Sequence, residues 1–243
     1  MKHNHIGKKI TALRATLPQG VTLIAVSKYH PIDAIQAAYD AGQRHFGESK
    51  AQDLTAKHEA LPKDINWHFI GHLQTNKVKY IAPFVHLIHS IDSYKLLCEV
   101  DRQGAKAGRR IPCLLQIHIA QEETKFGLTP QECRELLAQG EWRNLANIEL
   151  RGIMCMASNT DDTAQLHNEF SQAQQLFNEI KKEHFANNGR FNIISAGMSD
   201  DHPIAIEHGS THIRLGSSIF CEELQKRAKK FCHLHKKSYL CTS

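Results

Sequence analysis

The feature of this sequence that most constrains its fold is a strict alternation of short apolar or β-branched runs with stretches of helical periodicity. Eight such runs occur in a chain of 243 residues, and each precedes a helical stretch. Eight strand–helix units in about 250 residues are typical of a closed (β/α)8 barrel. An open doubly wound sheet remains the second interpretation, because strand order cannot be read from a sequence, although the GxGxxG motif is absent. The predicted strands span residues 21–28, 45–48, 67–71, 87–92, 112–119, 148–156, 192–197 and 212–220.

Composition and charge indicate one folded unit followed by a basic tail. Hydrophobic residues make up 41% of the chain and charged residues 23%, which excludes disordered and low-complexity classes. We expect residues 1–221 to form the barrel with a helical N-terminal lead-in, and residues 222–243 to form a basic helical tail. The tail carries six lysines and arginines against two glutamates, and so accounts for four of the net charge of +5. Because this excess lies in a tail rather than on a folded patch, we do not expect nucleic acid as a partner.

The sequence contains neither a membrane span nor an export signal. No apolar run reaches about 18 residues, and the first 20 residues lack the apolar core of a signal peptide. We therefore expect a cytoplasmic protein that does not bind membranes. The seven cysteines include no CxxC pair, which in such a protein indicates reduced thiols, several of them buried.

The 17 histidines raise the question of a metal site. Three groups could supply ligands: His3 with His5, His86 with His89, and Cys232, His233, His235 and Cys241 together. None has the HExxH or paired CxxC spacing that fixes ligand geometry, and exposed or locally hydrogen-bonded histidines are the commoner case. We expect no metal site.

Polar residues follow several of the predicted strands at the point where each strand ends. Active sites of parallel barrels are built at the carboxyl ends of the strands and on the loops that follow. We therefore expect these residues to lie together at one mouth of the barrel. They are Lys28, Glu48, His72, Asp92, Arg214 and Gly216.

Lys28 is the sharpest of these candidates. It follows the apolar run 23–26 and Ser27. A lysine at the end of a barrel strand is partly desolvated, which favours the free amine that can attack an aldehyde. The alternative is a lysine whose stem lies on the rim while its ammonium group reaches water.

Two loops have the features of a phosphate site. The stretch 195–201, with Gly197 and Ser199, closes the seventh strand and opens a helix, and the stretch 214–218, with Gly216 and Ser217, closes the eighth. Unpaired backbone N–H groups favour an anion there, glycine lets the backbone come close, and serine hydroxyls add donors. One such turn is at least as often a plain helix cap. Two of them favour phosphate binding, because strand 8 of a closed barrel lies next to strand 1 and Lys28.

Arg214 supplies a third polar anchor. Period-two alternation places Arg214 and Gly216 on one side of the strand and Ile213 and Leu215 on the other, so Arg214 is expected to project into the barrel. The alternative is an outward arginine paired with a helical carboxylate. A phosphate site, an aldehyde-reactive lysine and a third polar anchor together describe pyridoxal 5′-phosphate held as a Schiff base. An arginine at the pyridine nitrogen would keep that nitrogen unprotonated and the electron sink weak.

These residues resemble the pyridoxal phosphate homeostasis proteins, the YggS/PROSC family of pyridoxal phosphate-binding barrels. The order and spacing of the motifs hold over roughly residues 20–221. The matching segments are Ala25-Val26-Ser27-Lys28, 45–48, 67–77, Arg151-Gly152-Ile153-Met154, Gly197-Met198-Ser199-Asp200-Asp201, 209–211 and Arg214-Leu215-Gly216-Ser217.

The resemblance implies a monomeric barrel similar to the N-terminal domain of alanine racemase. It implies Lys28 as the Schiff-base lysine, Arg214 near the pyridine nitrogen, and Ser199, Gly216 and Ser217 at the phosphate. Met198, which precedes Ser199, completes the expected cofactor-binding set. It further implies a protein that buffers or delivers the cofactor in vitamin B6 homeostasis, with transient apoenzyme recipients and without established catalytic turnover.

The chain departs from the family pattern at three places. Ser49 stands where the family usually has Asn, and Ser217 stands where it usually has Thr. Ser217 keeps the hydroxyl at the phosphate, whereas Ser49 loses an amide. The stretch 122–127 also differs, which leaves a role for Lys125 in transferring the cofactor undecided, and the tail lies outside the match.

Two other functions remain open on sequence alone. An amino-acid racemase of the same barrel class needs acid–base groups on both faces of the substrate α-carbon, and Tyr29 is the first candidate for the second base. A phosphosugar- or nucleotide-binding barrel would use Lys28 only as a positive charge. The carrier is favoured over the racemase, because the sink is weak and no partner base can be placed.

Overall fold

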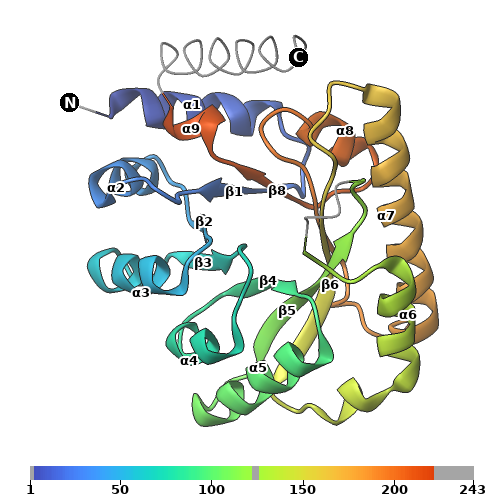
Figure 1. Cartoon of the computed structure of the whole chain (residues 1–243). Helices are drawn as coiled ribbons and strands as arrows, with labels where there is room; N and C mark the ends of the chain where they lie inside the picture. Colours follow the sequence, from blue (N-terminus) through green and yellow to red (C-terminus); the bar gives the residue numbers. More distant parts are fainter. Residues whose placement is uncertain (1–2, 122–125, 222–243) are drawn as a thin grey trace, which may run out of the picture.

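The computed structural model describes residues 3–121 and 126–221. Eight parallel strands close into a barrel in the order β1 to β8, with β8 beside β1 (Figure 1). The predicted (β/α)8 barrel is confirmed. The strands are β1 (Thr22–Val26), β2 (His45–Glu48), β3 (Asn66–Phe69), β4 (Leu87–Ile91), β5 (Ile111–His118), β6 (Ile148–Met156), β7 (Ile193–Ser195) and β8 (His212–Leu215).

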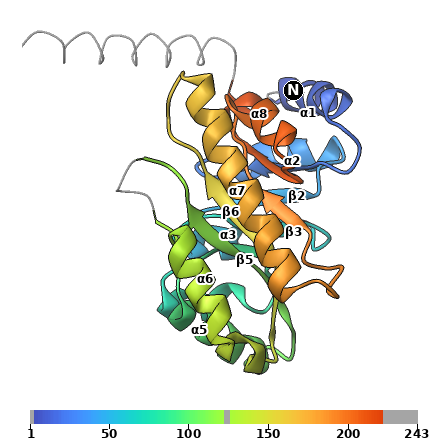
Figure 2. The same cartoon turned by 90° about the vertical axis from the view of Figure 1, so that its right-hand side faces the viewer.

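Helices surround the strands, and the long α7 runs along one side of the barrel beside α6 (Figure 2). Helix α6 starts at a reciprocal cap between Thr129 and Glu132 and ends at Gly140, whose φ is 75°. Helix α7 starts where the Asp162 side chain accepts from two backbone N–H groups. The helices are α1 (Asn4–Thr16), α2 (Ile32–Asp40), α3 (Ala51–Ala60), α4 (Val78–Ile81), α5 (Tyr94–Lys106), α6 (Pro130–Gln139), α7 (Thr163–His184), α8 (His202–Glu207) and α9 (Ser217–Phe220), with 3-10 turns η1 (Thr75–Lys77) and η2 (Glu141–Asn144).

Alternation along the strands divides the buried residues into two layers. The outer layer packs under the helices and includes Trp67 and Phe69. A small apolar cluster, made of Leu87, Leu114, Met154 and Ile193, is separate from this layer and belongs to the opposite face of the strands. Other positions of that inner face carry polar side chains, and the candidate site is built from these.

The N-terminal lead-in is helical, as predicted. Ile6 and Ile10 of α1 are buried in the outer core, and Lys9 donates to the carbonyl oxygen of Cys221. Helix α1 therefore lies against α9, which follows β8 (Figure 1). The packing joins the first and last described elements across the β1–β8 closure.

The predicted strand bounds hold for β2 and β6 and differ elsewhere. The eighth strand was expected to reach residue 220 but ends at Leu215, because the backbone at Gly216 leaves the extended region and Ser217–Phe220 form α9. The helix after β7 begins at His202 rather than at Ser199. The predicted basic helix after residue 221 and Lys125 lie outside the described residues.

Five cysteines lie in the described ranges, and all five are free thiols. Burial raises the pKa of Cys133 and of Cys155 to about 12, which keeps both thiols protonated. Reduced cysteines were predicted for the chain, and these five agree. In residues 3–121 and 126–221, no helix combines the length and the apolar character needed to cross a membrane.

Candidate functional site

Lys28 lies just beyond β1, at the carboxyl end of the barrel strands. Ser27 is fully buried, whereas Lys28 is exposed, so the prediction of a partly desolvated amine is wrong for this structure. The reason is that β1 ends at Val26 and the chain then turns through Tyr29, whose φ is 66°. Ile24 and Val26 lie on the inner face of β1, and Lys28 follows them just beyond the end of the strand.

Glu48 was expected at the mouth, but it lies on the outer face of β2. Gly47 occupies the inner face, where an added Cβ would lie 3.2 Å from Ile24 Cγ2. The buried Glu48 carboxylate accepts from Ser27 Oγ at 2.5 Å and from Lys57 Nζ at 2.7 Å. Burial raises the pKa of Glu48, while the hydrogen bonds from Lys57 and Ser27 oppose the shift. Glu48 therefore ties β1, β2 and α3 together rather than lining the mouth.

The loops after β7 and β8 meet at the mouth. Ser217 Oγ donates to Ser199 Oγ at 3.0 Å. A Cβ added at Gly216 would lie 3.3 Å from the carbonyl oxygen of Val26, so the β8 loop also approaches the end of β1. The two predicted phosphate loops thus come together beside the strand that leads to Lys28.

Gly197 and Asp201 shape the β7 loop. Gly197 has a φ of 94°, a conformation that favours glycine, and an added Cβ would lie 2.9 Å from Ala205 Cβ. The Asp201 carboxylate accepts from the backbone N–H of Met198. That N–H is therefore already paired, and the Met198 side chain is 39% exposed.

Arg214 projects into the barrel interior, as the alternation predicted. Its Nη1 donates to the carbonyl oxygen and to Oγ of Ser195, both at 2.7 Å. Its Nη2 donates to the carbonyl oxygen of Cys155, on β6, at 2.9 Å. Burial lowers the pKa of Arg214. These bonds fix the guanidinium inside the barrel. They exclude the alternative of an outward arginine paired with a helical carboxylate.

His72 and Asp92, which follow β3 and β4, also come together. His72 Nδ1 lies 3.1 Å from Asp92 Oδ2. The His72 ring stacks on Phe126, with ring centroids 4.3 Å apart. His72 and Asp92 therefore lie together after neighbouring strands, which agrees with one part of the prediction that the strand-end residues share one mouth.

A chain of hydrogen bonds runs from Arg214 through the barrel interior toward the amino-terminal end of the strands. Ser195 Oγ lies 3.0 Å from His89 Nδ1, and His89 Nε2 lies 2.8 Å from His68 Nδ1. His68 Nε2 lies 2.9 Å from His45 Nδ1. Sequence analysis missed Ser195, His68 and His45 as parts of one network, because they lie on three different strands.

Burial keeps the interior histidines neutral. Desolvation lowers the pKa of His45 and of His212 to about 4, and lowers the pKa of His68 and His89 well below the usual 6.5. The positive charge of Arg214 lowers the pKa of His89 further. A neutral imidazole has one donor and one acceptor nitrogen. Each ring in the chain can therefore donate to one neighbour and accept from the other.

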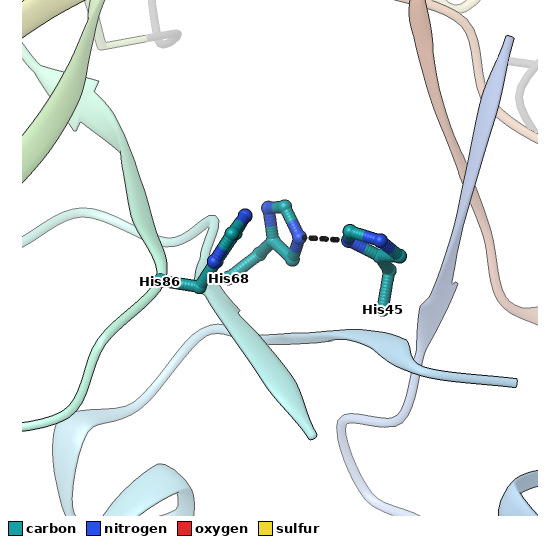
Figure 3. A group of neighbouring side chains, drawn as sticks. All are labelled: His45, His68 and His86. Atoms are coloured by element: carbon teal, nitrogen blue, oxygen red, sulfur yellow. Dashed lines mark hydrogen bonds between the residues drawn. The ribbon is translucent and has the colours of Figure 1, made fainter. Parts of the chain in front are cut away.

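Three histidines gather at the amino-terminal end of the barrel strands: His45, His68 and His86 (Figure 3). One nitrogen of each ring lies within 4.8 Å of the others. Sequence analysis had grouped His86 with His89 instead. Within the two described ranges, no other group of three potential ligand residues comes this close.

The comparisons with known proteins decide the family. The family model of the alanine racemase N-terminal domain matches residues 2–223. A pyridoxal phosphate homeostasis protein of Helicobacter pylori is 36% identical over 204 residues, which cover 83% of this chain and 88% of the relative. The chain belongs to the family of pyridoxal phosphate homeostasis proteins. Two further members of this family are similar: one of Synechocystis, 38% identical over 86% of this chain and 95% of the relative, and one of Schizosaccharomyces pombe, 37% identical over 83% and 84%.

Solved structures agree with this assignment. PipY of Synechococcus elongatus, solved without pyridoxal phosphate, has a TM-score of 0.83 and 37% identity, covering 88% of this chain and 99% of PipY. PipY with pyridoxal phosphate bound has a TM-score of 0.79 and 36% identity over the same shares. An alanine racemase of Clostridium difficile, only 9% identical with a TM-score of 0.70 over 89% of this chain and 55% of the racemase, shares the barrel fold. The homeostasis proteins are therefore related to the racemase barrel in fold.

Proposed function

We propose that this chain binds pyridoxal 5′-phosphate as a Schiff base on Lys28 and acts as a carrier or buffer in vitamin B6 homeostasis, without robust catalysis. Membership of the homeostasis family and the cofactor in the PipY relative support this proposal. Transient apoenzymes would be the recipients.

The observation that carries the proposal is the meeting of the two serine loops beside the end of β1. The hydroxyls of Ser199 and Ser217 lie 3.0 Å apart, and hydroxyl groups at such a spacing suit the oxygens of one phosphate group. Gly216 approaches Val26 without a Cβ between them, which lets the β8 loop lie directly against the end of β1. These groups fit the phosphate end of the cofactor.

Lys28 would supply the amine. Bound, the cofactor supplies an aldehyde that condenses with this amine and releases water. The exposed position of Lys28 lets the cofactor enter and leave from solvent, which suits a carrier better than a closed active site. Lys28 would therefore hold the cofactor reversibly.

Arg214 would face the pyridine nitrogen. An arginine guanidinium does not give up a proton in proteins, so it can donate a hydrogen bond to that nitrogen but cannot protonate it in the way a carboxylic acid does. Ser195 and Cys155 hold the guanidinium in place. A weak electron sink of this kind is consistent with slow or absent turnover.

Reductive trapping tests the Schiff base. Purified protein loaded with pyridoxal phosphate is treated with borohydride, digested and examined by mass spectrometry. We expect the cofactor-sized mass on the peptide that contains Lys28, and its loss in Lys28→Ala. Lys50→Ala, which removes another exposed lysine that follows a neighbouring strand, is the matched control and should retain the label. A colourless protein that cannot be loaded, or a label that persists in Lys28→Ala, would overturn the proposal and favour the phosphosugar-type barrel.

Exchange of the α-proton tests the absence of robust catalysis. A panel of amino acids in deuterated water should show little exchange with the loaded protein. Tyr29, the candidate second base, is 79% exposed. Exchange at enzyme-like rates that both Lys28→Ala and Tyr29→Phe abolish would show that the racemase interpretation is correct.

A further inference from the structure

We propose that His45, His68 and His86 form a site for one divalent transition metal ion, such as zinc, at the amino-terminal end of the barrel. His45 begins β2, His68 lies within β3, and His86 directly precedes β4 (Figure 3). The Lys28 mouth lies at the opposite, carboxyl end of the strands. The metal site is therefore separate from the proposed cofactor site and stands independently of it.

The spacing of the three rings suits tetrahedral coordination. Zinc–nitrogen bonds of about 2.0–2.1 Å place two ligand nitrogens about 3.4 Å apart. His45 Nδ1 and His68 Nε2 lie 2.9 Å apart, and the three ligand nitrogens all lie within 4.8 Å of one another. The His86 side chain is exposed, so it can make the remaining adjustment by rotating. A metal ion would replace the direct hydrogen bond between His45 and His68.

Two of the rings already have the outer hydrogen bonds that metal-binding histidines need. A histidine that binds a metal through one nitrogen almost always uses the other nitrogen for a hydrogen bond that fixes its orientation. His68 Nδ1 bonds to His89 Nε2 at 2.8 Å, and His89 in turn bonds to Ser195. His45 Nε2 lies 3.4 Å from the Asn66 side-chain amide, whose oxygen and nitrogen can exchange places. These bonds leave His45 Nδ1 and His68 Nε2 to face the ion.

The ligand types select the metal. Three imidazole nitrogens suit zinc, copper or nickel, whereas magnesium and calcium require oxygen ligands. Three protein ligands also leave a fourth position open, as in metal sites that keep a bound water or anion.

The surroundings of the site favour an anion in that fourth position. A surface pocket of about 390 Å³ reaches His45 and is also lined by Arg14. The positive charges of Arg109 and Arg151 act on His86. These charges oppose a bare dication, and a hydroxide or other small anion bound to the metal offsets them. We therefore expect the metal to bind together with an anion from solvent.

Protein acceptors hold all three arginine side chains, and one of these acceptors is charged. Arg14 donates to Gln43 Oε1 at 2.8 Å, and Arg109 donates to the carbonyl oxygen of Val85 at 2.8 Å. Arg151 pairs with the carboxylate of Glu149 at 3.3 Å. The arginine side chains are thus held by protein acceptors, rather than free to occupy the position between the three rings.

Titration of the full-length protein with Co²⁺ tests the proposal. Each spectrum is recorded as a difference from the metal-free protein, so that any chromophore already present cancels. We expect one equivalent of Co²⁺ to produce the intense visible bands of tetrahedral nitrogen–oxygen coordination, without a thiolate charge-transfer band. Zn²⁺ should displace the Co²⁺ and abolish the bands.

Variants locate the bound ion. His86→Ala removes an exposed ligand and should weaken binding at least about 100-fold while leaving the far-UV circular dichroism unchanged. Asn66→Ala removes an outer hydrogen bond and should weaken binding by about 10–100-fold. His167→Ala, which removes an exposed histidine paired with His208 on the helical layer, is the matched control and should bind as the wild type does.

Two results would overturn the proposal. One is an unchanged Co²⁺ titration in His86→Ala and in the double variant His45→Ala with His86→Ala. The other is a spectrum dominated by thiolate charge transfer, which would assign the bound metal to cysteines elsewhere in the chain.

Discussion

The Arg214 guanidinium is held by Ser195 through both the hydroxyl and the carbonyl oxygen, each 2.7 Å from Nη1. The same hydroxyl lies 3.0 Å from His89 Nδ1. Arginine is only a donor, so it occupies one lone pair of the hydroxyl and leaves His89 to pair with what remains. Ser195 therefore connects Arg214, which is proposed to face the cofactor, with the histidines inside the barrel.

Ser195→Ala should destabilise the protein. The change leaves a buried polar nitrogen of His89 without its partner, which costs about 1–3 kcal/mol in the free energy of unfolding. Urea denaturation followed by circular dichroism measures it. Ser217→Ala, which removes an exposed hydroxyl, should change the unfolding free energy by less than about 0.5 kcal/mol. Equal denaturation midpoints for wild type and Ser195→Ala would contradict the role of the hydroxyl in the network.

Replacing Ser199 or Ser217 by alanine should weaken cofactor binding. If each hydroxyl donates to the phosphate, its loss costs about 1.5 kcal/mol, or roughly a 10-fold higher Kd. Titration of the protein with pyridoxal phosphate, followed by absorbance, measures the change. Ser171→Ala on α7 serves as the control, because its side chain pairs with Gln175 on the same helix. Unchanged affinity in both variants would remove these serines from the phosphate site.

The sequence was sufficient to predict the barrel because the evidence for each strand is local. The bounds of β2 and β6 were predicted correctly. The end of β8 was not, because Ile219 and Phe220 are apolar both as strand residues and as residues of a short buried helix. Periodicity over four residues does not distinguish these two cases.

The interior of the barrel was harder to predict, because its contacts join residues far apart in the chain. Glu48 was expected at the mouth because it ends a strand, but the end of a strand does not say which face its last side chain takes, and a shift of one residue reverses that face. His68 stands between the buried aromatic residues Trp67 and Phe69, and this alternation could have identified it as an inward polar residue. Its neighbours His45 and His89 lie on other strands, so their contact required the closed barrel.

Lys57→Ala should be strongly destabilising. It leaves the fully buried Glu48 carboxylate without its cationic partner, and breaking such a buried pair costs about 3–5 kcal/mol. Denaturant unfolding measures the loss, and a second substitution, Glu48→Gln, should recover part of it by removing the unpaired charge. Arg134→Ala breaks the more exposed pair with Glu179 and should cost no more than about 1 kcal/mol. Similar losses for Lys57→Ala and Arg134→Ala would contradict this difference.

Gly152→Ala should disrupt the pairing of β6 with β7. Gly152 has a φ of 148°, and an added Cβ would lie 1.8 Å from the carbonyl oxygen of Ile193, a contact that only a backbone shift can relieve. We expect a loss of about 3–5 kcal/mol in unfolding free energy, measured in urea. Gly189→Ala is the matched control, since its Cβ would meet no atom within 4 Å. A Gly152→Ala protein as stable as Gly189→Ala would show that the strands yield more easily than the structure indicates.

Acidification should destabilise the fold through its buried histidines. The folded-state pKa of His212 is about 4 and that of His89 is well below 6.5, so the unfolded chain binds protons that the folded chain does not. The free energy of unfolding is therefore highest above pH 6.5 and falls progressively as the pH decreases toward about 4. Each histidine adds up to about 1.4 kcal/mol per pH unit to this slope. Urea midpoints measured from pH 7.5 to 5 in the presence of a chelator should therefore fall with pH, and fall less steeply in His212→Gln. His167→Gln, a change at an exposed histidine, should retain the wild-type slope, whereas a stability that rises on acidification would show that these rings are not held neutral in the native state.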